Sequence, residues 1–108
     1  MLNQVILVGR LTKDLELIEG ENGKKNCIIQ LAVHRPYKNI DGEYEYDFIE
    51  CELWNMVAEN TSAYCHKGDI VGIKGRIERL ENNDMKIIAE KVTFLSSKSK
   101  EINEEIEN

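Results

Sequence analysis

The order of its β-rich and helical segments restricts the fold of this chain more than any other feature of the sequence. The β-rich runs are separated by turn residues and cover five segments, residues 3–11, 26–35, 44–54, 70–79 and 85–95. Between the third and fourth runs, Asn55 is a favourable N-cap and Gly68 a favourable stop signal. The apolar positions between them predict a short amphipathic helix, with a face formed by Met56, Val57, Ala63 and Tyr64.

Three strands, one helix and two further strands are the succession of a five-stranded Greek-key barrel, the OB-fold. This all-β fold with one helix between strands 3 and 4 closes its own sheet edges. It suits a chain of 108 residues, which has room for one modest core. We therefore expect one OB-fold domain over residues 1–95. Because the fold binds oligonucleotides, oligosaccharides or proteins, it leaves the function open.

The third run, residues 44–54, alternates between two chemically different faces. One set of alternating positions predicts a compact core face and consists of Asp47, Ile49, Cys51 and Leu53. The other set combines aromatic and acidic side chains, and consists of Tyr46, Phe48, Glu50, Glu52 and Trp54. Because buried unpaired carboxylates are costly, we expect this second face to meet water. Large aromatic side chains on a wet face indicate a binding partner.

The sharpest binding candidates are Tyr37, Phe48 and Trp54, which are predicted to stack unpaired bases. The alternative is that these rings pack under a loop or in a subunit interface. Three stacked bases at about 2 kcal/mol each would contribute roughly 6 kcal/mol. That energy corresponds to an affinity between millimolar and micromolar. Useful binding would therefore also need phosphate contacts and more than one subunit on the same strand.

Basic side chains are the candidates for those phosphate contacts. They are Arg10, Lys13, Arg35, Lys38, Lys67, Lys74, Arg76 and Arg79. The ordinary alternative for each is a solvated surface residue. Arg35 and Lys38 gain weight because they flank Tyr37 in sequence. The net charge of −6 weakens a nucleic-acid prediction. It does not exclude one, since charges in water are screened over about 8 Å.

No catalytic, metal or cofactor site is expected. The histidines and cysteines have no zinc-ligand spacing, and they are His34, His66, Cys27, Cys51 and Cys65. No nucleophile elbow, phosphate loop or paired-carboxylate motif is found. Sparse, unpatterned cysteines suit a reducing cytosol. The longest apolar run, residues 5–8, is too short to span a membrane, and no secretory signal follows Met1. We therefore expect a cytoplasmic protein.

The C-terminal residues 96–108 are expected to form a short, disordered acidic tail. They hold two Lys and four Glu, and beyond a Ser/Lys-rich linker only Ile102 and Ile106 are apolar.

Several segments resemble bacterial single-stranded DNA-binding proteins in sequence and in order. They are residues 1–17 (MLNQVILVGRLTKDLEL), 31–35 (LAVHR), 47–54 (DFIECELW), 58–60 (AEN) and 67–76 (KGDIVGIKGR). The resemblance covers about residues 1–95, and the opening segment is the most specific. It implies an OB-fold that assembles as a homotetramer, a dimer of dimers, and wraps single-stranded DNA with little sequence preference. The family's stacking aromatics fall on Tyr37, Phe48 and Trp54, and a basic residue of the family falls on Lys67.

Four departures from the family pattern bear on this expectation. The hairpin near residues 80–86 is short and lacks a fourth stacking aromatic, which affects the length of bound DNA. Asn55 and Met56 stand where the family often has basic residues. Leu15 replaces a usual proline and Ile29 an often aromatic core position. The chain ends without the acidic Ile-Pro-Phe tip through which the family recruits replication and repair proteins, which suits a phage- or mobile-element-encoded protein.

The leading hypothesis is non-catalytic, nucleoid-associated binding of single-stranded DNA in replication, recombination or repair. The alternative is an OB-fold protein-interaction module that uses the aromatic face for another protein. The net charge, the missing basic pair and the missing hairpin aromatic favour that alternative. An RNA-binding barrel of the cold-shock type would need more basic and aromatic residues on the sheet.

Overall fold

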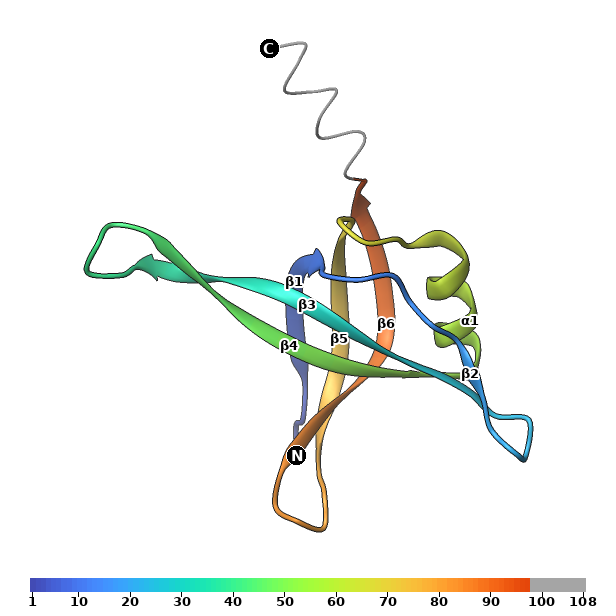
Figure 1. Ribbon diagram of the computed structural model, residues 1–108. Coiled ribbons are helices and arrows are strands. Elements are labelled where there is room, and N and C mark those ends of the chain that lie inside the picture. Colours follow the sequence, from blue (N-terminus) through green and yellow to red (C-terminus); the bar gives the residue numbers. More distant parts are fainter. Residues whose placement is uncertain (98–108) are drawn as a thin grey trace.

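The computed structural model describes residues 1–97 as a twisted sheet closed on itself, with one helix against it (Figure 1). The strands are β1 (Val5–Leu11), β2 (Ile18–Glu19), β3 (Lys25–Lys38), β4 (Tyr44–Trp54), β5 (Ile70–Arg79) and β6 (Met85–Ser96), and the helix is α1 (Asn55–Tyr64). The fourth and fifth of these strands begin and end where the sequence predicts. Part of the expected acidic tail, from residue 98 on, lies outside the described residues.

Closure of the sheet comes from a second pairing of the first strand. The six strands lie in the order β1-β5-β6-β4-β3-β2, and β1 also pairs with β3 at Arg10↔Ala32 and Leu11↔Leu31. The long strands β4 and β6 run parallel, with Cys51 opposite Ile87. The two-residue strand β2 extends the edge of β3 and was not predicted. The five long strands therefore form the closed barrel with one helix that the element order predicts.

The core is formed by alternate residues of the strands, as the period-two pattern predicts. Its fully buried side chains are Leu11, Ile29, Leu31, Leu53, Ile73, Val71, Cys27 and Cys51. Asp47 is the exception to the prediction, because it lies half-exposed and paired with Arg35 rather than in the core. At that point the two strands have left the barrel. Asp47 is therefore hydrated and paired with Arg35, whereas the alternate residues further along β4 make apolar contacts in the core.

Helix α1 differs from its predicted boundaries and orientation. Trp54 takes the N-cap position without a side-chain hydrogen bond, so the predicted capping role of Asn55 is wrong. The helix ends at Tyr64, where the Cys65 N–H donates to the Thr61 carbonyl oxygen, and it does not reach Gly68. The positive φ of Gly68, 95°, instead serves the turn that leads into β5.

The buried face of α1 consists of Ala58 and Thr61, with Val57 packed against the core. Met56, Ala63 and Tyr64, predicted to face inward, are exposed. The reason is steric, because the small side chain of Ala58 allows close approach of the short helix to the barrel. Within residues 1–97, no helix is long and apolar enough to cross a membrane.

The β3–β4 hairpin continues beyond the barrel as a projecting ribbon, seen at the left of Figure 1. We call residues 34–47 of this hairpin the arm. Strand β3 was expected to end at residue 35, but it runs on through Pro36 to Lys38. Here the register jumps from His34↔Tyr46 to Lys38↔Tyr44. Such an irregularity accommodates Pro36, whose nitrogen cannot donate a ladder hydrogen bond.

Candidate nucleic-acid interface

One face of the β3–β4 ribbon points away from the core along its whole length. On β4 it carries Tyr44, Tyr46, Phe48, Glu50, Glu52 and Trp54, which alternate with the core residues. Register places five residues of β3 beside them, namely His34, Ala32, Gln30, Ile28 and Asn26. We call this surface the outer face. Its exposure confirms that the aromatic side of residues 44–54 is the wet one.

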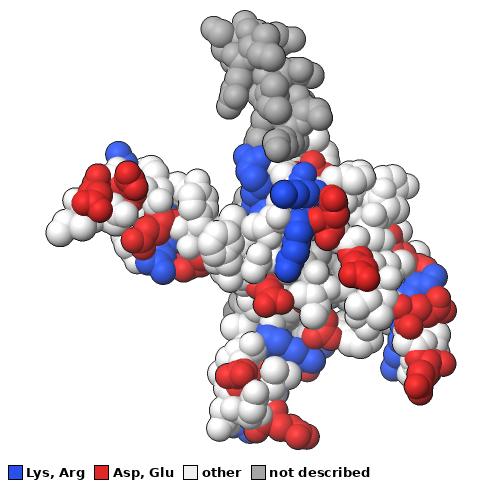
Figure 2. All heavy atoms as spheres, viewed as in Figure 1, with Lys and Arg blue, Asp and Glu red and all other residues white. Residues whose placement is uncertain are grey.

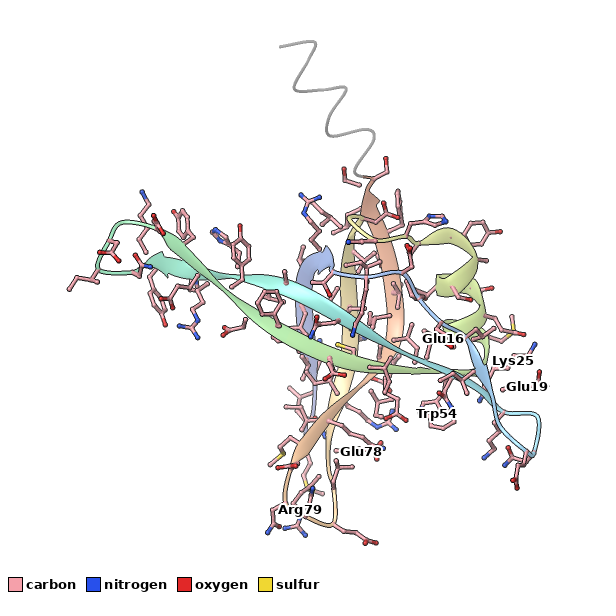
Figure 3. All side chains as sticks on the ribbon, viewed as in Figure 1. Glu16, Glu19, Lys25, Trp54, Glu78 and Arg79 are labelled. Atoms are coloured by element: carbon pink, nitrogen blue, oxygen red, sulfur yellow. The ribbon has the colours of Figure 1, made fainter. Side chains whose placement is uncertain are left out.

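Phe48 and Trp54 are presented on the outer face in different surroundings. Phe48 lies opposite the small Ala32 and is 65% exposed, so its ring is open to a ligand. Trp54 is 36% exposed and ends β4 where α1 begins. It borders an open groove of about 510 Å³ whose remaining lining residues are Gly20, Asn22, Lys24, Asn26 and Asn55. Figure 3 shows Trp54 between the core of the barrel and the β2–β3 hairpin.

The groove beside Trp54 is rich in amides. Three of its lining residues are asparagines, and Asn55 adopts a positive φ of 52°. Asparagine tolerates this left-handed conformation better than most residues, which explains how the chain turns directly from β4 into α1. An aromatic ring with neighbouring amides offers a flat apolar surface together with hydrogen-bonding groups. Such a site suits a nucleobase.

Tyr37 is separated from these two aromatics. It is exposed in the irregular part of β3 and interacts electrostatically with Arg35. The Arg35 guanidinium donates to Asp47 Oδ1 at 2.8 Å and to Glu45 Oε2 at 2.7 Å. Asp47 and Glu45 alternate with the residues of the outer face, so this ion-pair cluster lies on the opposite side of the arm. The structure therefore brings Phe48 and Trp54 onto one face and places Tyr37 with Arg35.

The Arg35 cluster shifts the pKa values of two of its members. Hydrogen bonds and the attraction of Arg35 hold the pKa of Asp47 below its usual value. The same pairing with Asp47 raises the pKa of Arg35. Because both carboxylates are matched by this guanidinium, Arg35 has less charge available for a phosphate than its place beside Tyr37 suggests.

The outer face contains aromatic residues that were not singled out as site residues. Tyr44 and Tyr46 continue the line from Phe48 into the arm, and His34 lies beside both rings. The alternation of residues 44–54 contains the signal for both tyrosines. The contact with His34 depends on the register of β3 against β4, which a single-strand pattern does not contain.

The other basic candidates are dispersed over the barrel. Arg10 Nη1 donates to the Gly68 carbonyl oxygen at 2.7 Å, and the Lys67 backbone N–H donates to Asp14 at 2.9 Å. Arg76 pairs with Glu78 and Glu90. In the described part of the chain, five candidates form no ion pair, namely Lys13, Lys38, Lys67, Lys74 and Arg79. Lys38 lies with its ammonium 5.4 Å from the Tyr44 ring centroid.

Charges of both signs are interspersed on the molecular surface, as Figure 2 shows for one side. The outer face itself carries Glu50 and Glu52, and Glu52 pairs with Lys86 at 3.5 Å. Within residues 1–97, Glu50 has no ion-pair partner. Exposed aromatic rings rather than a continuous basic stripe are thus the dominant feature of this surface.

The side chains that could bind a metal ion or take part in redox chemistry are dispersed over the described part of the chain. Among residues 1–97, no three His, Cys, Asp or Glu side chains lie close enough together to hold a metal ion. Cys27, Cys51 and Cys65 are buried free thiols. Burial raises the pKa of all three, and that of Cys51 to about 11.

Comparison with known proteins places this geometry in a family. The model of the single-strand binding protein family matches residues 2–95. Single-stranded DNA-binding protein B of Bacillus subtilis is 43% identical over 94% of this chain and 96% of its own length. Single-stranded DNA-binding protein 3 of Listeria innocua is 46% identical over 91% of this chain and 66% of its own length.

A solved structure shares the fold. It is the crystal structure of a deletion mutant of the single-stranded DNA binding protein from Thermus aquaticus, which matches 92% of this chain and 53% of that chain with a TM-score of 0.73 at 21% identity. The match supports the OB-fold assignment of the barrel. Since the family model spans nearly all of the barrel and the two relatives align with most of the sequence, the chain belongs to the single-strand binding protein family.

Proposed function

We infer that this protein binds single-stranded DNA on the outer face of β3 and β4, with little sequence preference and without catalysis. The observation that carries this function is the pair of exposed rings, Phe48 and Trp54, on an OB-fold barrel of the single-strand binding protein family. The two relatives are named for binding single-stranded DNA. Aromatic rings on a β-sheet stack on any base, because every base has a π-face.

Phosphate contacts supplement the stacking in this proposal. The candidates whose charge is not matched by an ion pair in the described residues are Lys13, Lys38, Lys67, Lys74 and Arg79. Arg10, Arg35 and Arg76 already donate to protein oxygens, so we assign them a smaller share. Tyr37 is proposed as a contact of the same strand at the edge of the arm. Its separation from Phe48 requires the strand to pass around the ribbon.

We further propose that the protein acts as a homotetramer on the bacterial nucleoid, in replication, recombination or repair. The support for assembly is the outer side of β1, where Ile6 and Val8 are exposed. Among the described residues, β1 pairs with β3 only at Arg10 and Leu11, which leaves most of that strand edge open. Exposed apolar residues on an open edge favour pairing with another chain. Light scattering should give the mass of four chains, and Val8→Lys should lower it.

The deciding experiment is a titration with an unstructured oligothymidine of a few tens of nucleotides, followed by the fluorescence of Trp54. The chain contains one tryptophan, so the signal has a single source. We expect strong quenching that weakens with salt, with a log–log slope near −0.7 per phosphate neutralised. Absence of quenching at low salt would contradict the proposal. The aromatic face would then fit a protein-interaction module better.

A further inference from the structure

The arm carries a second aromatic cluster, distinct from Phe48 and Trp54. The ring centroids of His34 and Tyr44 are 4.1 Å apart with an interplanar angle of 44°. Those of His34 and Tyr46 are 5.3 Å apart in an edge-on arrangement of 69°. The ammonium of Lys38 lies 5.4 Å from the Tyr44 centroid. These contacts place three rings and one positive charge on a single side of the arm.

This cluster is not part of the core. The buried residues of these two strands end at Leu31 on β3 and Cys51 on β4, before the arm begins. Tyr44 and Tyr46 remain 46% and 53% exposed despite their contacts with His34. Cross-strand aromatic pairs do stabilise a ribbon. Stabilisation of the ribbon explains why the rings contact each other. It does not explain why about half of each tyrosine remains exposed to solvent.

The cluster is continuous with the proposed stacking surface. Tyr46 and Phe48 are two residues apart on one side of β4, which corresponds to about 7 Å along the strand. Tyr44 is a further 7 Å or so away in the same direction. No core or loop segment is inserted between these three residues, because they belong to one continuous strand. A ligand that stacks on Phe48 and extends along β4 therefore reaches both tyrosines.

The charged groups that lie beside the tyrosines of β4 are distributed between the two sides of the arm. The carboxylates of Glu45 and Asp47 alternate with the tyrosines and are paired with Arg35 on the opposite side. Lys38 lies opposite Tyr44 in the register and contributes its positive charge on the aromatic side. Glu45 and Asp47 are thus separated from the aromatic groups of the arm, whereas Glu50 and Glu52 in the middle of β4 share the outer face with Phe48 and Trp54. The two remaining carboxylates of the arm, Asp41 and Glu43, lie at its tip, in the turn that joins β3 to β4.

We propose that Tyr44, Tyr46 and His34 form a second base-stacking site for the same single strand, with Lys38 contacting a phosphate. This proposal rests on the proposed function and extends it. The strand follows β4 from the groove at Trp54, over Phe48, and out along the arm. The arm replaces stacking area that the short β5–β6 hairpin does not supply, since Leu80 and Met85 rather than aromatics flank that turn.

The test compares oligothymidines of two lengths with a double variant, Tyr44→Ala with Tyr46→Ala. A short oligomer that just suffices to quench Trp54 should bind the variant within threefold of the unchanged protein. A long oligomer should lose affinity by about 30-fold or more, as expected when stacking is lost on two rings. Tyr64→Ala is the matched control, because Tyr64 is 75% exposed on α1 and outside the outer face. It should leave both affinities unchanged.

The alanine double variant could lose affinity for the long oligomer because its arm misfolds. A second variant and a crosslinking experiment distinguish that case from the loss of stacking. Tyr44→Phe with Tyr46→Phe keeps both rings and should retain the long-oligomer affinity. Photo-crosslinking of an oligomer containing iododeoxyuridine should yield adducts on the arm, at Tyr44 or Tyr46.

Two results would overturn the inference while leaving the proposed function intact. One is unchanged long-oligomer affinity in the alanine double variant, which would suit an arm that binds a protein instead. The other is crosslinking at Phe48 and Trp54 without any adduct on the arm. Failure of the proposed function has a different signature, because then no oligomer of either length would quench the Trp54 fluorescence of the unchanged protein.

Discussion

At the scale of single residues, the two exposed rings Phe48 and Trp54 are the proposed stacking positions, and neither fills the core. We expect Phe48→Ala and Trp54→Ala each to weaken single-stranded DNA binding by about 1–3 kcal/mol, because each removes one stacking surface. Thermal unfolding should show an intact fold. Phe48→Ala can be followed by Trp54 fluorescence, and Trp54→Ala by anisotropy of a labelled oligomer. If either variant unfolds, the substituted ring is needed for the fold, and the argument that it is free for binding is contradicted.

A second residue-scale prediction concerns the Arg35–Asp47 pair. The lowered pKa of Asp47 means that the folded state favours the ionised carboxylate. The pair therefore stabilises the fold above the ordinary aspartate pKa and loses that contribution as the pH falls through the lowered value. Carboxyl-carbon NMR should show the low pKa, and Arg35→Gln should raise it. Arg76→Gln, which breaks a different ion pair, should leave the Asp47 titration unchanged.

At the scale of elements, barrel closure depends on close approach between strands. A Cβ on Gly75 would lie 2.0 Å from the Ile88 carbonyl oxygen, at the irregularity between β5 and β6. One on Gly9 would lie 2.8 Å from the Ala32 carbonyl oxygen, where β1 meets β3. Backbone atoms cannot move aside as a flexible side chain can, so both positions exclude larger residues.

We expect Gly75→Ala to lower the free energy of unfolding by about 1–3 kcal/mol, the usual range for overpacking. Gly72→Ala is the matched control on the same strand, because its nearest neighbour would be a Leu95 side-chain atom at 3.7 Å, an ordinary contact. Urea unfolding of the two variants measures the difference. Equal stability of both would show that β5 and β6 can separate at Gly75 without cost.

At the scale of the whole molecule, the three thiols report on the integrity of the barrel. Cys27, Cys51 and Cys65 are buried, and burial raises the pKa of Cys51 to about 11. A thiol reagent at mildly alkaline pH should therefore react only when the barrel opens, since the thiolate is the reactive form. Denatured protein should react rapidly at all three positions, which provides the control. Rapid reaction of one thiol in the native protein would contradict this expectation and would show that the barrel opens locally around that cysteine.

The sequence by itself determined the succession of the five long strands and the helix, and it distinguished the core side of β4 from its wet side. Alternation is a local property of an extended chain, and the cost of burying Glu50 and Glu52 assigns one side to water. It also provided the resemblance that the family model and the relatives confirm. Two strands, β4 and β5, agree with their predicted ends.

Only the tertiary structure decided the face of α1, the continuation of β3 past Pro36 and the grouping of the aromatic residues. Helix α1 is short, and its contact with the barrel through Ala58 outweighs the weak apolar pattern of its own sequence. The irregular register near Pro36 separates Tyr37 from Phe48 and brings His34 to Tyr44 and Tyr46. These relations depend on how one strand pairs with another. A residue's position along its own strand does not contain that information.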